Sequence, residues 1–337
     1  MATASTVASI VVTPQINDFT PVRRAFTAVG SPAGAAPVVR LIDAVNGQDL
    51  FPPFLAYNAD FRGGVRVAVG DVNGDGYKDI VTSPGPGGTA FVAVYSGLSG
   101  KLLTSFRAYN DSFQGGAYVA VADVNGDKRA DIITAAGEGG GPHVRVFDGA
   151  TFAEIRGFMA YPTTYVGGVT VAAGDVDGDG KAEVITAPVS GPTTTNDVRV
   201  FSVTANSHKL VTNFSIADAT AGVNIATANI DGDKKVEIIV GPTNNVNSKV
   251  RVFNGASVEI GSFNAFDTVF AGGIRLAGAD IDGDGKQEII AGAVTNNTAR
   301  IRILSGLTGT LARELTTAVV SSSANVFLAG GSAFGVV

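Results

Sequence analysis

The sequence predicts an all-β fold, a six-bladed β-propeller of four-stranded antiparallel blades, with seven blades as the alternative. Three observations predict it. Glycine supplies 44 of the 337 residues and proline 13, a composition that favours tight turns over long helices. A strand-like segment recurs six times at nearly constant spacing. Finally, the two ends of the chain carry complementary parts of one such repeat unit.

The repeat is clearest in a segment that reads Val-Arg-Val-Phe. It occurs at 144–147, 198–201 and 250–253, as Ile-Arg-Ile-Leu at 301–304, and more loosely at 38–42 and 92–95. The second residues of the six copies lie 53, 52, 54, 52 and 51 residues apart; they are Arg40, Ala93, Arg145, Arg199, Arg251 and Arg302. This spacing makes residues 26–337 a six-unit propeller and residues 1–25 an N-terminal extension. The rungs of a β-solenoid, the competing repeat architecture, are usually shorter.

Each unit contains four segments with the composition of short strands. In one unit these are 65–72, 79–83, 91–97 and 103–109, which are rich in β-branched and aromatic residues and bounded by glycine and proline. Connections such as 96–101 look like hairpin turns, and no apolar run keeps helical spacing. Four antiparallel strands in about 50 residues are typical of a propeller blade.

The sixth unit is divided between the two ends of the chain. Residues 325–337 resemble a first strand, whereas segments 26–30, 38–43 and 51–57 resemble the other three strands. A blade built from both ends would close the ring and remove free sheet edges. We therefore expect the N- and C-terminal strands to share one blade.

A nine-residue acidic loop follows the predicted first strand of five units. Side-chain oxygens at positions 1, 3, 5 and 9, with the backbone carbonyl of position 7, are the hard ligands that Ca²⁺ prefers. We predict up to five structural Ca²⁺ ions. The expected ligands are Asp71, Asn73, Asp75, Tyr77 and Asp79; Asp123, Asn125, Asp127, Arg129 and Asp131; Asp175, Asp177, Asp179, Lys181 and Glu183; Asn229, Asp231, Asp233, Lys235 and Glu237; and Asp280, Asp282, Asp284, Lys286 and Glu288.

Charge repulsion within the loops supports this interpretation. The loops hold 17 of the 30 acidic residues, and carboxylates about 5 Å apart repel by roughly 3 kcal/mol per pair at an effective dielectric constant of about 20. A bound divalent cation reverses the sign of that interaction. The alternative is a turn held by Asx hydrogen bonds alone, but five copies in register with the repeat favour metal. An EF-hand is disfavoured because its twelfth position, normally Glu, is here Thr82, Thr134, Thr186, Val240 or Ala291.

The five loops are not expected to bind equally. Position 6 is glycine in three loops but Lys128 and Lys234 in the second and fourth, and a side chain in a left-handed conformation costs about 1 kcal/mol. The fourth loop also begins with the neutral Asn229. We expect the third and fifth loops to bind most tightly and the fourth most weakly.

The unit GGVRVAVGDVNGDGYKDIVTSPGPGGTAFVAVYSG, and the segments around Asp175 and Asp280, resemble the FG-GAP/VCBS repeat of integrin α-subunit propellers and bacterial surface proteins. The resemblance implies that each acidic loop joins the first two strands of a blade and binds Ca²⁺ structurally. It also implies a role in adhesion or in sugar or protein recognition, although some related propellers are enzymes. The sixth unit departs from the pattern, with Ser332 at the first ligand position, so we expect no metal there.

Composition narrows the function further. A net charge of −6 argues against nucleic acid as a partner, no apolar stretch suits membrane insertion, and the chain has no cysteine. No signal peptide is visible. His143 and His208 are the only histidines, and neither has a nucleophile at a recognisable spacing, so we assign no catalytic or cofactor-binding residue.

These observations predict a non-enzymatic module at the cell surface or outside the cell. It would bind a carbohydrate or a surface protein, or assemble with itself, and the alternative is a polysaccharide-active lyase or dehydratase with its site at the mouth of the ring. Any ligand is expected on the face opposite the acidic loops, where the variable loops between second and third strands lie.

Two further sets of repeated residues are expected to be structural. The first is the recurring strand arginine, which we expect to pair with neighbouring carboxylates. The second is a set of aromatic residues that we expect to pack between blades: Phe54, Tyr57 and Phe61; Phe106, Tyr109 and Phe113; Phe158, Tyr161 and Tyr165; and Phe263, Phe266 and Phe270.

Overall fold

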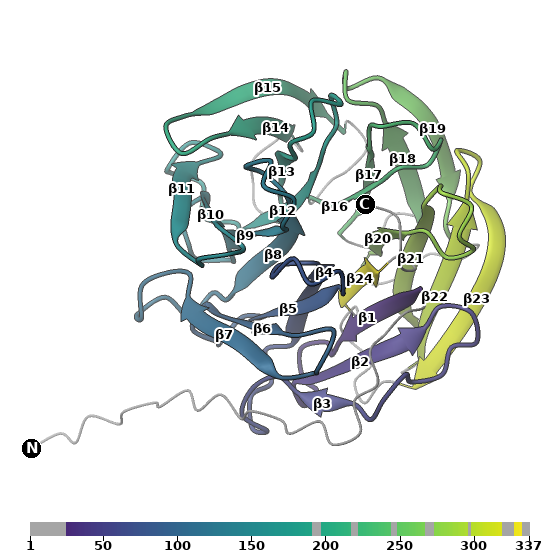
Figure 1. Ribbon diagram of the computed structural model, residues 1–337, viewed down its shortest axis with the longest axis horizontal. Coiled ribbons are helices and arrows are strands. Elements are labelled where there is room, and N and C mark those ends of the chain that lie inside the picture. The colour runs from purple at the N-terminus through teal and green to yellow at the C-terminus, as the bar shows by residue number, and fades with distance from the viewer. Residues whose placement is uncertain are drawn as a thin grey trace, which may run out of the picture.

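The computed structural model describes residues 25–190, 197–216, 222–243, 248–266, 273–295, 298–318 and 327–331. These residues form six four-stranded antiparallel sheets arranged around a central axis (Figure 1). The described part of the chain contains no helix, and therefore no helix able to cross a membrane. The predicted six-bladed propeller is confirmed, and the seven-bladed alternative is excluded.

Five blades take their strands in chain order, from the axis outward. They are β4 (Val65–Gly70), β5 (Asp79–Pro84), β6 (Phe91–Tyr95) and β7 (Leu102–Arg107); β8 (Ala117–Ala122), β9 (Asp131–Ala136), β10 (His143–Phe147) and β11 (Glu154–Met159); β12 (Val169–Gly174), β13 (Glu183–Pro188), β14 (Asp197–Val203) and β15 (His208–Ser215); β16 (Val223–Ala228), β17 (Glu237–Pro242), β18 (Lys249–Phe253) and β19 (Glu259–Asn264); and β20 (Arg275–Ala279), β21 (Glu288–Thr295), β22 (Thr298–Ser305) and β23 (Thr310–Ala318).

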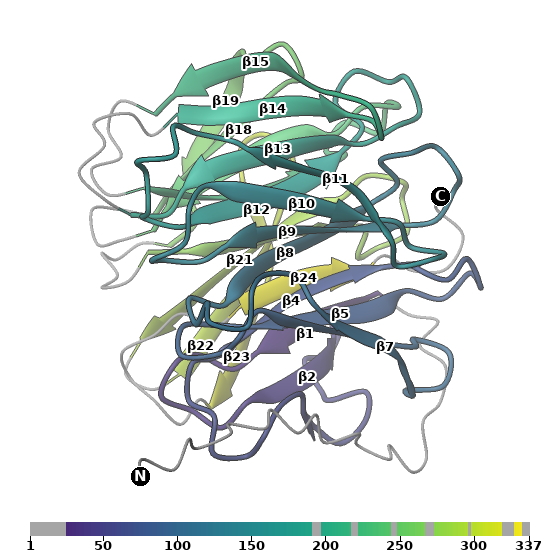
Figure 2. The same ribbon diagram turned by 90° about the vertical axis from the view of Figure 1, so that its left-hand side faces the viewer.

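The remaining blade joins the two ends of the chain, as predicted. β24 (Phe327–Gly331) pairs with β1 (Phe26–Gly30), which is followed by β2 (Val38–Asp43) and β3 (Phe54–Leu55). The inner strands β4, β8, β12, β16, β20 and β24 each contact the next, so the ring is closed (Figures 1 and 2). Strand β3 is shorter than expected because Pro52 and Pro53 cannot donate to a ladder. Ser332 lies outside the described residues.

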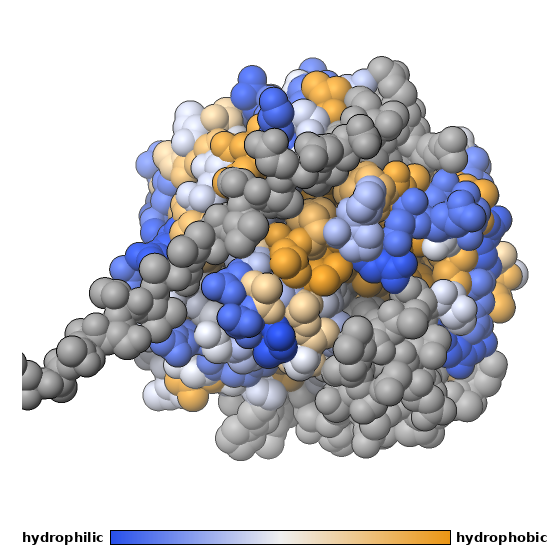
Figure 3. Space-filling model, turned by 90° about the horizontal axis from the view of Figure 1, so that it is seen from below, coloured by the Kyte–Doolittle hydropathy of each residue, from blue (hydrophilic) through white to orange (hydrophobic). Residues whose placement is uncertain are grey.

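The core lies between the blades. The second strands β5, β9, β13 and β17 are buried along their whole length, whereas the outer strand β15 is largely exposed. Each main hydrophobic cluster joins neighbouring blades; one, for example, brings Tyr118 and Phe158 of one blade against Val184 and Phe201 of the next. The outside is mixed, and Figure 3 shows hydrophobic and hydrophilic side chains alternating on one side of the molecule.

The repeated arginines are structural, as predicted. All five pair with a carboxylate on their own blade: Arg40 with Asp49, Arg145 with Glu154, Arg199 with Asp197, Arg251 with Glu259 and Arg302 with Glu314. Arg145, Arg199 and Arg302 also bridge to the preceding blade. Arg199 donates to the carbonyl of Ala160 at 2.8 Å, Arg302 to that of Ala265 at 2.9 Å, and Arg145 to that of Ala108.

The repeated aromatic residues also join blades. The hydroxyl of Tyr57 donates to the carbonyl of Phe91 at 3.0 Å, and that of Tyr161 donates to the backbone carbonyl of Asp197 at 2.7 Å. Each bond runs from the end of one blade to the third strand of the next. Packing between blades is therefore confirmed for this position, although Phe270 lies outside the described residues.

Candidate metal centre

The five acidic loops lie at the same end of the ring, because each directly follows an inner strand. They are also bonded to one another. The N–H of position 8 donates to the carbonyl of position 1 in the preceding loop, in the pairs Ala130 to Asp71 (2.8 Å), Ala182 to Asp123 (2.7 Å), Val236 to Asp175 (2.9 Å) and Gln287 to Asn229 (2.6 Å). We call this continuous arrangement the loop belt. Sequence reasoning treated the loops as separate, and the belt is a feature it missed.

The carboxylate at position 1 organises its loop. In the first loop, Oδ1 of Asp71 accepts the N–H groups of Gly74 (2.8 Å) and Asp75 (3.0 Å), and Oδ2 accepts that of Gly76 (2.8 Å). The carboxylates at position 1 of the second, third and fifth loops likewise accept the N–H groups of positions 4 and 6. These loops are thus Asx-bonded turns, and a metal would bind through lone pairs of the same oxygens that these hydrogen bonds leave free.

Position 6 is left-handed in four loops, as expected. Its φ is 84° at Gly76, 69° at Lys128, and 87° at both glycines of the third and fifth loops. Lys234 of the fourth loop has no positive φ, so the expectation is wrong there. The reason is chemical. An amide has only one acceptor oxygen, and Nδ2 of Asn229 instead donates to the carbonyl of Asp233 at 2.6 Å. The fourth loop therefore has a different turn.

The carboxylate at position 9 is buried in every loop. Where it is aspartate, backbone N–H groups hold both oxygens. Oδ2 of Asp79 accepts from Val72 at 3.0 Å and Oδ1 accepts from Gly97 at 2.9 Å, and Asp131 is bonded in the same way. Where it is glutamate, as at Glu183, the backbone N–H of position 2 reaches Oε2. Sequence reasoning treated aspartate and glutamate at this position as equivalent, but the longer side chain leaves Oε1 for another partner.

Two loops gather three carboxylates that could hold a metal ion. Single oxygens of Asp175, Asp177 and Glu183 all lie within 4.8 Å of one another, and those of Asp280, Asp282 and Glu288 do the same. These are the third and fifth loops, in which positions 1, 3 and 9 are all acidic. Carboxylate oxygens without histidine or cysteine suit a hard cation. The two clusters are thus the parts of the predicted ligand sets that the structure brings together.

Several of the other predicted ligands already form hydrogen bonds with groups in or near their own loops. At position 5, Oδ1 of Asp179 accepts the N–H of Lys181 and Oδ1 of Asp284 that of Lys286, both at 2.8 Å. The first two loops carry asparagine at position 3, and Nδ2 of Asn125 donates to Asp148 at 3.1 Å. The backbone carbonyls of position 7 remain predictions.

The side chain at position 7 has a role that sequence reasoning missed. A Cβ added at Gly74 would lie 3.1 Å from Nε of Arg129, and one added at the glycine at position 4 of the second, third or fourth loop would lie 3.2 Å from a side-chain carbon of Lys181, Lys235 or Lys286. The basic side chain at position 7 thus packs over the acidic loop before it. The sequence carried a signal, because position 7 is basic in every loop except the first, where Tyr77 follows a blade without an acidic loop.

Burial shifts the protonation of the position 9 carboxyls. Desolvation raises the pKa of Asp79 and of Glu183 to about 7, and that of Asp131 and of Glu237 to about 6, against the lowering effect of backbone N–H donors. Burial raises the pKa of Glu288 as well. In the metal-free protein these groups therefore keep their protons to a higher pH than free carboxyls do.

This shift predicts that the metal-free protein loses stability as pH rises. Because the folded pKa values exceed those of the unfolded chain, about 4, the protonated carboxyls stabilise the fold fully at pH 4. That contribution is lost as pH rises through 6 and 7. In EDTA, the melting temperature followed by circular dichroism is expected to fall between pH 5 and pH 8.

Two comparisons make this measurement specific. Burial lowers the pKa of His143, and this shift makes the fold more stable as pH rises. One histidine therefore opposes the combined effect of the five carboxyls. The variant Glu183→Gln should show a smaller fall than the unmodified protein. A melting temperature that rises across this interval in EDTA would contradict the prediction.

Comparison with known families agrees with this loop and blade arrangement. A family model described as an FG-GAP-like repeat matches residues 71–134 and 123–186, which include the first three acidic loops. The chain is therefore a six-bladed β-propeller that contains FG-GAP-like repeats. No curated protein sequence matches the chain.

Three solved structures that are similar to this propeller have low sequence identity to it. A protein of unknown function from Bacteroides caccae is 8% identical, with a TM-score of 0.50, over 91% of this chain and 98% of that one. A chain of the mitotic checkpoint complex is 12% identical, with a TM-score of 0.50, over 98% and 97%. The exotype rhamnogalacturonan lyase YesX is 13% identical, with a TM-score of 0.48, over 90% of this chain but 64% of the lyase. The propeller spans less than two thirds of that enzyme's length. The first two similarities show the fold alone.

Proposed function

We propose that this FG-GAP propeller is a Ca²⁺-stabilised binding module that acts outside the cytoplasm and takes a carbohydrate or surface-protein ligand. The observation that carries the proposal is the convergence of three carboxylates in each of two loops of the belt. A divalent cation would neutralise carboxylates that repel one another. Because the loops are hydrogen-bonded in series, a cation in one loop would also stiffen its neighbours.

Calcium is the favoured ion for two reasons. The available donors are carboxylate oxygens on a short loop, and Ca²⁺ accepts six to eight oxygens in flexible geometry, whereas Mg²⁺ demands near-octahedral coordination and keeps its water. Loops of this kind also suit the millimolar Ca²⁺ found outside cells, where weak sites are still filled. This supports an extracellular or cell-surface location.

The ligand is proposed to bind on the face opposite the loop belt. The connections between second and third strands lie there, among them residues 137–142 between β9 and β10. Rigid blades position these connections, as in other scaffolds where loops carry recognition. The metal sites that stabilise the ring would then lie at one end of it, and the ligand site at the other.

Calorimetric titration of the EDTA-treated protein with Ca²⁺ tests the proposal. We expect binding with the third and fifth loops tightest and the fourth weakest. Asp175→Asn should remove a tight site, and Asp280→Asn should remove the other. The matched control is Asp111→Asn, an exposed acid outside the loops that pairs with Arg107.

The test compares Ca²⁺ with Mg²⁺ and the two loop variants with the control variant. Equal binding of Mg²⁺, or tight sites that survive both loop substitutions, would contradict the calcium assignment. A glycan and surface-protein binding screen in Ca²⁺ then tests the ligand class. Release of a modified or cleaved saccharide in that screen would replace the binding module with the enzyme alternative.

A further inference from the structure

Four asparagines of this chain directly precede a glycine. Such a pair can rearrange, because glycine has no side chain to hinder its backbone nitrogen from attacking the asparagine side chain. Asn73 and Asn125 occupy position 3 of the first two acidic loops. Asn46 and Asn254 lie instead in the connections from β2 to β3 and from β18 to β19. We call the first two the loop pairs and the other two the hairpin pairs.

A carboxylate accepts the N–H of the glycine in both loop pairs. Gly74 donates to Oδ1 of Asp71 at 2.8 Å, and Gly126 donates to Oδ1 of Asp123 at 2.6 Å. A carboxylate in this place can take the amide proton while the nitrogen attacks, which is general base catalysis. Both glycines are exposed, so water reaches the reacting atoms.

A second hydrogen bond activates the side-chain carbonyl that is attacked. Oδ1 of Asn73 accepts the N–H of Asp75 at 2.9 Å, and Oδ1 of Asn125 accepts that of Asp127 at 2.8 Å. Such a donor stabilises the negative charge that develops on the oxygen when the carbonyl carbon is attacked. Each loop pair therefore has a base at the attacking nitrogen and a donor at the attacked carbonyl.

The hairpin pairs have the donor but not the base. In both, Oδ1 of the asparagine accepts the N–H two residues further on, at 2.9 Å for Asn46 and 3.1 Å for Asn254. The N–H of Gly47, however, donates to the backbone carbonyl of Asp43 at 2.8 Å, and a carbonyl is too weak a base to take the proton. Among the described residues, no carboxylate accepts the N–H of Gly255.

We propose that Asn73 and Asn125 undergo carboxylate-assisted deamidation in the folded, metal-free loops. The glycine nitrogen bonds to Cγ of the asparagine, the Cγ–Nδ2 bond breaks, and ammonia leaves with the proton that the glycine nitrogen has lost. Water then opens the cyclic imide. Cleavage of the new N–Cγ bond gives aspartate, and cleavage of the backbone C–N bond gives isoaspartate.

The aspartate product would complete the acidic pattern of these loops. It would give the first two loops acids at positions 1, 3 and 9, as in the two loops that gather three carboxylates. This consequence rests on the proposed calcium role, whereas the reaction itself does not.

Incubation of the full chain in EDTA, followed by tryptic digestion and mass spectrometry, tests the reaction. Cleavage after lysine and arginine places the four pairs on four different peptides, so the hairpin pairs are internal controls. We expect Asn73 and Asn125 to change from amide to acid about tenfold faster than Asn46 and Asn254. Equal rates at the four pairs, or faster change in the hairpin pairs, would overturn the proposal.

The variant Asp71→Asn separates the effect of the base from that of the loop. Its amide oxygen can still hold the turn, as the equivalent Asn229 accepts the N–H of Gly232 at 2.8 Å, but it cannot take a proton. Deamidation of Asn73 should fall to the rate of the hairpin pairs, while that of Asn125 stays unchanged. An unchanged or faster rate at Asn73 would show that the carboxylate does not assist the reaction.

Failure of this inference can be distinguished from failure of the proposed function. The variant Asn73→Asp carries the product acid from the start and should gain one tight Ca²⁺ site in calorimetric titration. Fast deamidation without that gain would leave the reaction standing and remove its calcium role. Slow deamidation together with that gain would remove the reaction and leave the calcium role.

Discussion

Calcium is expected to raise the melting temperature of the EDTA-treated protein by roughly 10 °C. Filling a site at a concentration one hundred times its dissociation constant adds about 2.7 kcal/mol of stability. Two filled sites therefore add about 5 kcal/mol, and each kcal/mol shifts the melting temperature of a large domain by about 2 °C or more. Scanning calorimetry in EDTA and in excess Ca²⁺ measures the difference.

The double variant Asp175→Asn with Asp280→Asn makes this test specific. It removes one carboxylate from each of the two clusters while leaving an oxygen that can still accept one turn hydrogen bond, as Asn229 does from Gly232 at 2.8 Å. Most of the calcium-induced shift should disappear. A shift of equal size in the double variant would show that other sites stabilise the propeller.

Leu328→Asp is expected to destabilise the protein by about 4 kcal/mol, the cost of placing an unpaired charge in a core. Leu328 lies on β24 and is buried against Val29, Ile42 and Ile301. This strand carries the C-terminal half of the closure, because it pairs with β1 and contacts both β4 and β20. Urea denaturation followed by tyrosine fluorescence gives the free energy of unfolding.

Leu311→Asp is the matched control. Leu311 lies on the outer strand β23 and is 48% exposed, so the same substitution should change stability by less than about 0.5 kcal/mol. Similar losses in the two variants would mean that closure by β24 contributes little. A large loss confined to Leu328→Asp would show that the ring depends on its shared blade.

Fold and loop positions could be predicted because they depend on local patterns repeated along the chain. Each glycine-rich turn and each alternating segment specifies one strand, and six copies at a spacing near 52 residues specify the number of blades. The acidic loops are equally local, since positions 1 to 9 fold upon themselves. The two clusters of three carboxylates also follow from composition, because only the third and fifth loops carry acids at positions 1, 3 and 9. The order in which the loops bind metal stays a prediction.

The exceptions arise where a single substitution changes the hydrogen bonds of a turn, or where a hydrogen bond comes from outside the loop. The left-handed conformation expected of Lys234 is absent because Asn229, five residues earlier, donates where an aspartate would accept. The hydrogen bond from the N–H of Gly97 to Asp79 comes from another hairpin of the same blade. The sequence alone therefore could not distinguish loops with aspartate at position 9 from loops with glutamate there.

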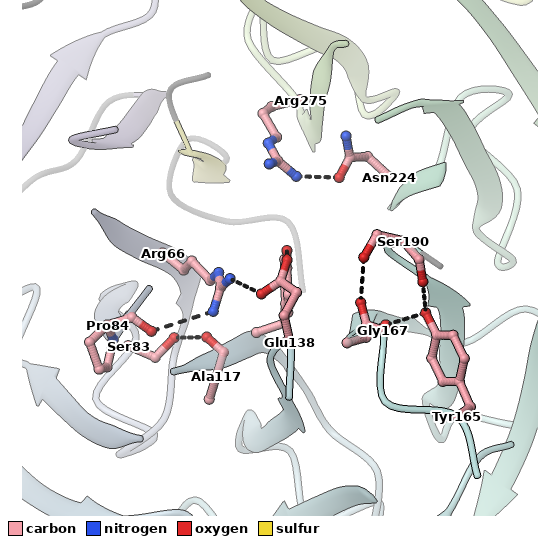
Figure 4. Close-up of polar contacts among 12 residues, drawn as sticks. Arg66, Ser83, Pro84, Ala117, Glu138, Tyr165, Gly167, Ser190, Asn224 and Arg275 are labelled. Carbon is pink, nitrogen blue, oxygen red and sulfur yellow. Dashed lines mark hydrogen bonds and ion pairs between the residues drawn. The ribbon is translucent and has the colours of Figure 1, made fainter. Parts of the chain in front are cut away.

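The sequence by itself determined the propeller, its closure by both ends of the chain, and the identity of the acidic loops. These features can be predicted because every copy of the repeat carries the same local pattern of strand and turn residues. The tertiary structure alone decided which groups meet across blades: the hydrogen-bonded belt, the basic side chains against preceding loops, and the pairs Arg66 with Glu138 and Arg275 with Asn224 (Figure 4). Residues more than 200 positions apart become neighbours only when the ring closes, since that closure brings the inner strands to a common axis.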